Sequence, residues 1–204
     1  MKRYEMDLCT GALWKKILLF SVPLMFTNLL QVVFNMSDVA VVGKFAGSLA
    51  LGSVGSTSIL VTMFTGILIG MASGVNALTA LYIGAKNDRN VRETVHTACI
   101  LCLSSGLLIL LFGFARHILT MMNTKPELID GAVRYLRIYV FGMPALALFN
   151  FGNAVLSASG DTKRPLYYLS FAGVINVILN LFFVIICKLD VAGVALASII
   201  AEYI

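Results

Sequence analysis

Residues 17–42, ILLFSVPLMFTNLLQVVFNMSDVAVV, form an apolar run in which polar side chains recur at regular intervals. Asn28, Gln31, Asn35 and Asp38 are spaced three, four and three residues apart. In a helix this spacing places all four side chains on one face. An acid at mid-depth in a bilayer costs roughly 2.5–3.5 kcal/mol on insertion scales, so such a face usually turns toward a cavity or a pathway. The run therefore predicts a membrane-spanning helix with a polar inner face, and transport is the first hypothesis.

The composition of the chain excludes an ordinary soluble domain. Of the 204 residues, 59% are hydrophobic and 12% are charged, whereas a soluble domain has about 25% charged residues. The formal net charge is +5, but the lysines and arginines stand in short groups between apolar runs. A nucleic-acid-binding protein would gather them on one surface. We therefore expect an integral membrane protein that is surrounded by the lipid bilayer and has no nucleic-acid partner.

Uncharged stretches of about 20 residues mark the expected membrane-spanning helices. The stretch 45–85 is too long for one straight span, and we expect an external loop near residues 46–48 followed by one long, tilted helix. The chain stops inside its last apolar stretch, so residues 1–204 are predicted to form one lobe of something longer, truncated in its sixth helix. The fold class is thus an all-α integral membrane protein with five complete spans and most of a sixth. The expected spans are residues 17–37, 45–85, 97–115, 138–160, 165–187 and 191–204.

The distribution of basic residues predicts the orientation in the membrane. The N-terminal segment and the connections after the second and fourth helices carry nine lysines and arginines, against six on the opposite side. By the positive-inside rule this bias places residues 1–16 in the cytoplasm, in a multi-pass protein of the plasma membrane. The connection 115–134 is then external, and a turn at residues 124–127 is expected to start a short amphipathic stretch before the fourth helix.

Three further expected helices carry polar side chains at helical spacing. Asn150 and Asn153 lie three residues apart, Asn176 and Asn180 lie four apart, and Ser198 stands in the sixth stretch. Hydrogen bonding between helices, at about 0.6 kcal/mol per bond, explains any single asparagine. Together these residues predict a polar interior that several helices share.

Asp38 indicates that this polar interior binds an ion, because packing between helices alone does not need an acid. An acid at the outer end of a span is also compatible with simple solvation, but the apolar residues 39–42 favour burial. A carboxylate with amide and hydroxyl oxygens suits a hard cation such as Na⁺. Since burial disfavours the charged form of an acid, the same site also suits a proton. We expect Asp38 to hold one of these two coupling ions, with no other cofactor or metal.

The sequence carries no recognisable enzyme centre. His96 and His117 stand at opposite ends of the third expected helix, and no GxSxG, HExxH or P-loop motif is present. The CxxC of Cys99 and Cys102 lies in an apolar run without a second pair, so we expect neither a disulfide nor a metal site there.

Several segments together resemble the multidrug and toxic compound extrusion (MATE) family, and the resemblance covers the chain as that family's N-terminal lobe. The resemblance implies two six-helix lobes around a central cavity that opens to either side of the membrane in turn. It also implies export of small organic cations and amphipathic drugs in exchange for Na⁺ or H⁺, with a missing C-terminal lobe as partner. The segments are residues 23–47, LYIGAKND at 81–88, YLR at 135–137, GMP at 142–144 and LSASGDTKRP at 156–165.

The resemblance further implies roles for individual residues. Asp38, Asn176 and Asn180 match the cation site of the N-terminal lobe. Ser198 falls where a hydroxyl is expected, and Tyr135 or Tyr139 is expected to supply a phenol. Some family members have an acid at the position of Asn180, so the coupling ion stays open. The residues expected at the drug cavity or in the polar stripe beside it are Gln31, Asn28, Asn35, Asn150 and Asn153, and Pro23 is the expected hinge.

Two other functions stay open at the level of the sequence. A flippase for lipid-linked oligosaccharides, from a related superfamily, would carry several arginines or lysines in its cavity for pyrophosphate, whereas the interior residues here are amides and an acid. A truncated membrane protein that does not transport would also fit a chain that stops inside its sixth helix.

Overall fold

The structure is a computed structural model that describes residues 13–110 and 115–204. Over these residues it contains helices and turns and no strand, as the sequence predicted. Residues 1–12, which belong to the segment expected in the cytoplasm, lie outside the described residues. The same holds for residues 111–114, at the end of the third expected span.

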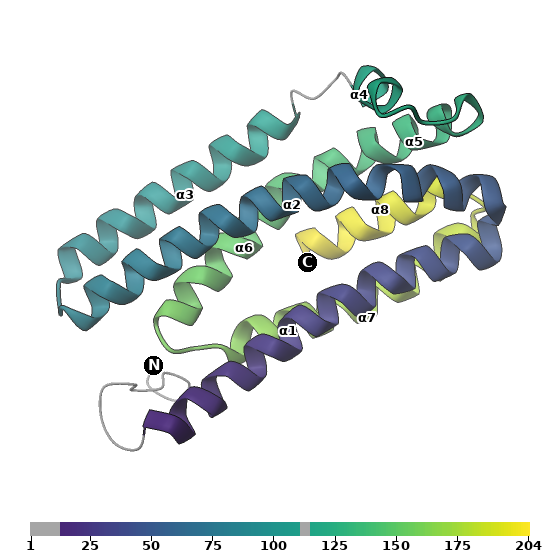
Figure 1. Ribbon diagram of the computed structural model, residues 1–204. Helices are drawn as coiled ribbons and strands as arrows, with labels where there is room; N and C mark the ends of the chain where they lie inside the picture. Colours follow the sequence, from purple (N-terminus) through teal and green to yellow (C-terminus); the bar gives the residue numbers. More distant parts are fainter. Residues whose placement is uncertain (1–12, 111–114) are drawn as a thin grey trace.

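The two longest helices, α1 (Leu13–Val41) and α2 (Gly47–Gly84), are joined by a single π-helical turn, Val42–Ala46. Gly47 has a φ of 87°, which a glycine adopts readily because it has no Cβ. The chain reverses direction there, so that α1 runs toward this end of the molecule and α2 runs back from it (Figure 1). The reversal expected near residues 46–48 is present and the long helix after it is α2, but a helical turn and one glycine take the place of a loop, and the external position stays a prediction.

The fourth expected span begins earlier than residue 138. Helix α5 (Pro126–Tyr139) has its proline in the first turn, where a missing N–H leaves no helical bond unmade. It continues through a 3₁₀ turn, Val140–Gly142, into α6 (Met143–Ala158). The amphipathic stretch expected before the span is thus its first half. The remaining elements are α3 (Asp88–Leu110), α4 (Ala115–Met121), α7 (Lys163–Leu181), the π-helical turn Phe182–Ile186 and α8 (Asp190–Tyr203).

Asp161 fixes where α7 begins. Its Oδ1 accepts hydrogen bonds from the backbone N–H groups of Lys163 and Arg164, both at 3.2 Å. Its carboxylate also forms an ion pair with the Arg164 side chain at 3.0 Å. An acid at this place satisfies N–H groups that have no partner within the helix. The segment that carried the family resemblance at 156–165 therefore sets the start of a helix that bears two candidate site residues.

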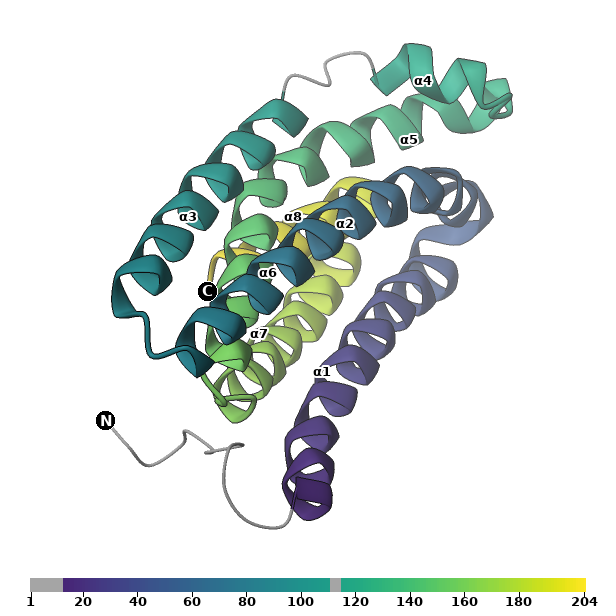
Figure 2. The ribbon, with the colours of Figure 1, turned by 60° about the vertical axis from the view of Figure 1, so that its left-hand side comes forward.

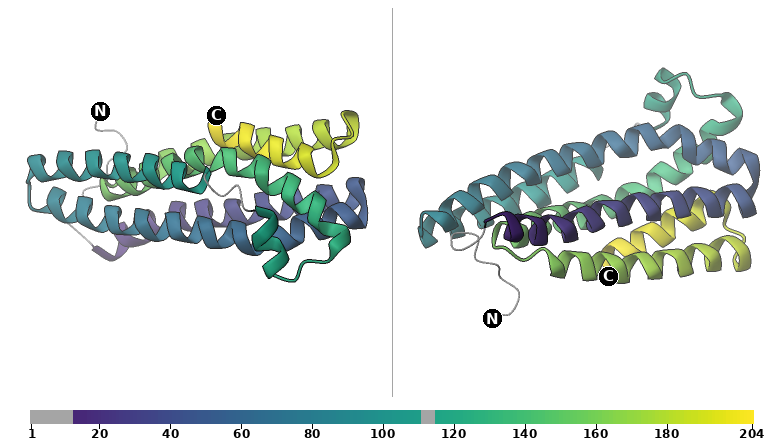
Figure 3. Two further views of the ribbon diagram at one scale, coloured as in Figure 1. Left: turned by 90° about the horizontal axis from the view of Figure 1, so that it is seen from above. Right: turned by 60° about the horizontal axis from the view of Figure 1, so that its bottom comes forward.

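The helices pack so that α8 lies inside the lobe. Helix α1 packs along α7, α7 packs on α8, and α8 packs on α5, whereas α2 contacts α3, α5 and α6. Figures 1 and 2 show α8 between α7 and the part of the bundle that contains α2 and α5. Figure 3 shows α4 projecting at the end opposite to the α2–α3 turn. Seven residues of α8, Ser198 among them, are consequently buried.

The outer surface of the lobe is apolar. Three described stretches are long and apolar enough to cross a membrane, Trp14–Gly84 with 71 residues, Pro126–Ala158 with 33 and Lys163–Ile186 with 24. The first stretch folds back at Gly47 and so contains both α1 and α2. Met25 and Met36 on α1 are 68% and 66% exposed. The membrane-protein class is supported, while the exact number of spans stays a prediction.

Candidate cation site

Four side chains from three helices form a closed ring of hydrogen bonds. Asn180 on α7 donates through Nδ2 to Asp38 Oδ1 on α1, and also to Asn176 Oδ1 at 3.0 Å. Asn176 Nδ2 donates to Ser198 Oγ on α8 at 3.4 Å. Ser198 Oγ in turn donates to Asp38 Oδ2 at 3.1 Å. The structure thus brings together the acid, both carboxamides and the hydroxyl that the sequence placed in a candidate site.

The ring lies inside the lobe, and its acid has no cationic partner. Asn180 is fully buried, Asn176 and Ser198 are each 6% exposed, and Asp38 is half-buried. Among the described residues, the ion pairs are Arg89–Glu93, Arg116–Asp130 and Arg164–Asp161, and none involves Asp38. Only neutral groups therefore hold the Asp38 carboxylate, and a buried anion of this kind is stabilised when a small positive ion joins it.

One oxygen of the four ring residues has no hydrogen-bond partner among the described residues. Asn180 Oδ1 is buried and accepts no hydrogen bond from any described residue. Buried polar atoms without a partner are rare in proteins, and each one needs an explanation such as an ion or a ligand. A carbonyl oxygen on the residue that binds Asp38 fits the donor set that hard cations prefer. The residues present therefore fit a small cation at Asp38.

A glycine on α7 lets α1 come close enough to complete the ring. Gly173 lies one turn before Asn176, and Phe34 lies one turn before Asp38. A Cβ added to Gly173 would overlap the ring of Phe34. Because the phenyl ring lies where a larger residue would place its side chain, the two helices stay in contact at the level of the acid.

Two π-helical turns adjoin the site. Val42–Ala46 begins four residues after Asp38, and Phe182–Ile186 begins two residues after Asn180. The two turns contact each other. Short π-helical segments within helices occur frequently at functional sites. The helix ends that carry the acid and the carboxamide are therefore irregular in the same region.

The two tyrosines are close to the ring but do not belong to it. Tyr135 and Tyr139 on α5 are buried, and their rings stack with centroids 5.5 Å apart and planes at 17°. Tyr135 is near enough to Asp38 to interact electrostatically. Within the described residues no hydrogen bond joins either phenol to Asp38. Their expected part in cation binding stays a prediction.

In the described part of the chain, no hydrogen bond joins the other polar residues predicted for the drug cavity to the ring. Asn28 and Asn35 are exposed on α1, and Gln31 is half-buried. On α6, Asn150 Nδ2 donates to the carbonyl of Leu146 at 2.8 Å. Asn153 Oδ1 accepts from the Ser157 hydroxyl at 3.2 Å. Their proposed contact with a substrate stays a prediction.

Pro23 lies within α1 and is buried. The Thr27 hydroxyl donates to the Pro23 carbonyl at 2.9 Å, a bond to the preceding turn that often accompanies a bend. A proline also removes one helical hydrogen bond. These features fit the expected hinge, which stays a prediction.

A second acid near the site was missed from the sequence. Glu202 stands in the last turn of α8, four residues after Ser198, and its carboxyl interacts with the Tyr139 hydroxyl. The spacing in the sequence could have indicated it, because an acid four residues after a candidate ligand lies on the same face of the helix.

Comparisons with known proteins show which family the chain resembles. The profile of the MatE family matches residues 23–182. The chain is 30% identical over 204 residues to the probable multidrug resistance protein YpnP of Bacillus subtilis (strain 168), covering 99% of this chain and 45% of that protein. It is 24% identical over 196 residues to a probable multidrug resistance protein NorM of Thermotoga maritima, covering 93% of this chain and 42% of that protein.

Solved structures show the same fold. A crystal structure of MATE in the bent conformation superposes with a TM-score of 0.89 at 24% identity, covering 94% of this chain and 43% of that chain. An outward-facing MATE family transporter of the MOP superfamily superposes with a TM-score of 0.85 at 24% identity, covering 92% and 42%. The chain thus spans less than half the length of these relatives. Because the family profile covers most of its residues, this chain belongs to the MatE family, that of the multidrug and toxic compound extrusion (MATE) transporters.

Proposed function

We propose that this chain is the N-terminal lobe of a cation-coupled multidrug efflux antiporter, with Na⁺ or H⁺ as its coupling ion. The closed ring around Asp38, with its unused Asn180 oxygen and no cationic side chain, is the observation that carries this proposal. Relatives named as probable multidrug resistance proteins support organic cations and amphipathic drugs as the substrates.

The coupling step takes place at the Asp38 carboxylate. While Asp38 is charged, the Asn180 amide and the Ser198 hydroxyl donate to it, and hydrogen bonds to a charged group are about twice as strong as neutral ones. A bound Na⁺ or proton neutralises the acid and weakens these bonds. Oxygens of Asp38, Asn176, Asn180 and Ser198 are the proposed ligands.

Helix α1 is the element that moves in response. It contacts the rest of the lobe chiefly through α7 and through the π-helical turn that follows it. Cation binding shifts α1 about Pro23, narrows the cavity of the lobe and expels the drug outward. Release of the cation on the other side returns α1 and reopens the cavity.

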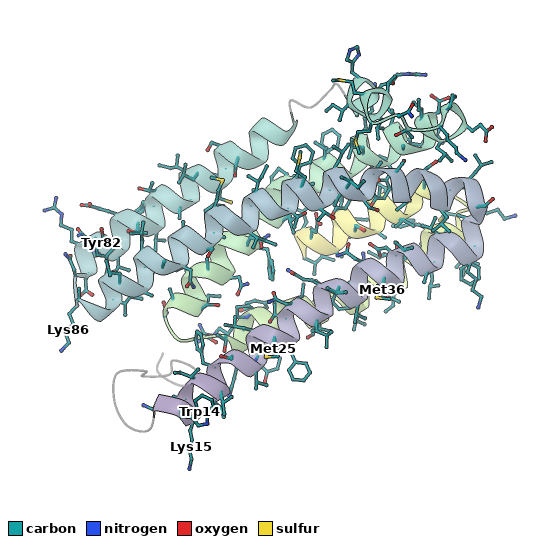
Figure 4. The ribbon with its side chains drawn as sticks, viewed as in Figure 1. Trp14, Lys15, Met25, Met36, Tyr82 and Lys86 are labelled. Atoms are coloured by element: carbon teal, nitrogen blue, oxygen red, sulfur yellow. The ribbon has the colours of Figure 1, made fainter. Side chains whose placement is uncertain are left out.

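The apolar surface of the lobe and the residues at its ends indicate how it lies in the membrane. The apolar exterior lies in the plasma membrane, and a second lobe of similar size completes the substrate cavity. Trp14, Lys15, Tyr82 and Lys86 stand at one end of the molecule (Figure 4). Aromatic and basic residues are typical of the cytoplasmic membrane interface, so this end and the N-terminus face the cytoplasm.

Efflux of a fluorescent organic cation from vesicles containing the intact transporter tests this function. Na⁺ and pH gradients are imposed separately, with the membrane potential held at zero. We expect one of the two gradients to drive efflux against a concentration difference. Efflux that neither gradient accelerates, or a complete lack of transport, would contradict the proposal.

A further inference from the structure

Glu202 occupies a second acidic position in the lobe that the coupling mechanism does not use. It stands in the last turn of α8, which packs against α5, α7 and the 3₁₀ turn before α6. The residue is half-buried, but its Oε2 is buried and accepts no hydrogen bond from any described residue. An acid with a buried, unpaired oxygen in a membrane protein is a functional candidate in its own right.

The backbone leaves space for this oxygen at a glycine. Gly142 is buried in the 3₁₀ turn Val140–Gly142, and a Cβ added there would collide with Glu202 Oε2. The same Cβ would lie 3.1 Å from Ile199 Cγ1. The next residue, Tyr203, donates its hydroxyl to the Phe141 carbonyl at 3.0 Å, which holds the end of α8 against this turn. This oxygen therefore lies against the backbone of Gly142 and close to an apolar side chain.

Within the described residues, the groups that face Glu202 provide no positive charge. Its hydrogen-bonding neighbour is the hydroxyl of Tyr139 on α5, whose ring stacks on that of Tyr135, and the charged group that acts on it is Asp38 on α1. No ion pair in the described part of the chain involves Glu202. An ionised Glu202 would thus be an uncompensated buried anion beside a second acid, which is strongly unfavourable.

We propose that Glu202 is a proton-binding site of its own, separate from the cation site at Asp38, and that it holds its proton at neutral pH. A proton fits better than a metal ion, because Tyr139 is the side chain that hydrogen-bonds to this carboxyl, whereas hard metal ions require several oxygen ligands. In the protonated acid, Tyr139 donates to one carboxyl oxygen and the other carries the proton. This inference goes beyond the antiport function and does not require that Asp38 exchange an ion.

Infrared spectroscopy of the intact protein in lipid vesicles tests the proposal directly, because a protonated carboxyl has a carbonyl band that a carboxylate lacks. At neutral pH we expect such a band, and labelling the glutamate carboxyl carbons with ¹³C should shift it. Glu202→Gln should remove the band. Asp190→Asn, which changes an exposed acid at the start of the same helix, should leave it in place.

A second variant separates hydrogen bonding from simple burial. Tyr139→Phe removes the hydroxyl next to the carboxyl, so the band should move to higher frequency rather than disappear. If Glu202→Gln does not fold, Tyr139→Phe decides the question, because a ¹³C-sensitive band that moves when this hydroxyl is removed belongs to the glutamate beside Tyr139. A spectrum with no ¹³C-sensitive protonated band, or a band that persists in Glu202→Gln, would overturn the proposal.

Discussion

At the scale of single residues, Ser198 uses both capacities of its hydroxyl. It donates to Asp38 Oδ2 and accepts from Asn176 Nδ2. A hydroxyl is a donor and an acceptor at once, so it closes the ring where neither a donor nor an acceptor alone would suffice. The site therefore depends on the type of group at this position as well as on its size.

Replacing Ser198 by alanine should destabilise the protein, whereas threonine should be tolerated. Alanine leaves a buried amide hydrogen and a carboxylate oxygen without a partner, and each such loss costs about 1–3 kcal/mol. Threonine keeps the hydroxyl. Thermal unfolding in detergent compares the variants, with Ser159→Ala on the loop before α7 as a control. Equal stability of wild type and Ser198→Ala would show that the ring does not hold the lobe together.

The members of the ring were predictable from the sequence, but its details were not. Asn176 and Asn180 share a face because of their spacing, and Asp38 stands out as an acid within an apolar run. The unused oxygen of Asn180 and the pairing of Glu202 with Tyr139 depend on how α5, α7 and α8 approach each other. Spacing along one helix carries no information about such contacts between helices.

At the scale of helices, the fit of Phe34 against Gly173 sets the distance between α1 and α7. A larger residue at 173 must push the helices apart, because its Cβ would overlap the phenyl ring. The contact lies one turn from both Asp38 and Asn176. Separation of the helices there would therefore open the ring.

Gly173→Ala should destabilise the lobe by about 1–3 kcal/mol, the range for overpacked cores, and should also weaken cation-driven efflux. Adding Phe34→Leu to the Gly173→Ala protein should restore much of the lost stability and of the lost efflux, because it removes the overlapping ring. Gly152→Ala on α6 is the matched control, since a Cβ there meets no atom within 4 Å. Independent effects of the two changes would argue against this contact as the determinant of spacing.

Helix boundaries were the weakest part of the sequence prediction, for a physical reason. Uncharged stretches marked the spans, yet α5 carries Asp130, Arg134 and Arg137 and still continues into α6. Likewise α3 begins at Asp88 rather than near residue 97. Charged side chains at the end of a membrane helix reach the interface or the surface, so they do not end the helix.

At the scale of the whole molecule, the cation site and the basic end are far apart along the helices. The ring lies near the π-helical turns that end α1 and α7, and Lys15 and Lys86 stand at the other end of the lobe (Figure 4). With the proposed orientation, the cation site lies nearer to the outer side of the membrane than to the cytoplasm. This agrees with a coupling ion that enters from outside.

Cysteine labelling tests this orientation. In a background without native cysteines, Asn87→Cys at the α2–α3 turn should react with a membrane-impermeant maleimide only after the cells are opened. Met121→Cys at the end of α4, where the native side chain is 82% exposed, should react in intact cells. The reverse pattern would place the N-terminus outside and would reverse the direction of coupling.

The role of Asp38 is tested most directly by recording drug efflux and coupling-ion entry together, in vesicles with equal amounts of wild-type, Asp38→Asn and Asp190→Asn protein. Asparagine keeps the shape of the side chain but removes the charge that attracts a cation. We expect coupled drug and ion fluxes in the wild type and in Asp190→Asn, and a fall of both to the level of protein-free vesicles in Asp38→Asn. Coupled fluxes of wild-type size in Asp38→Asn would contradict cation exchange at this carboxylate.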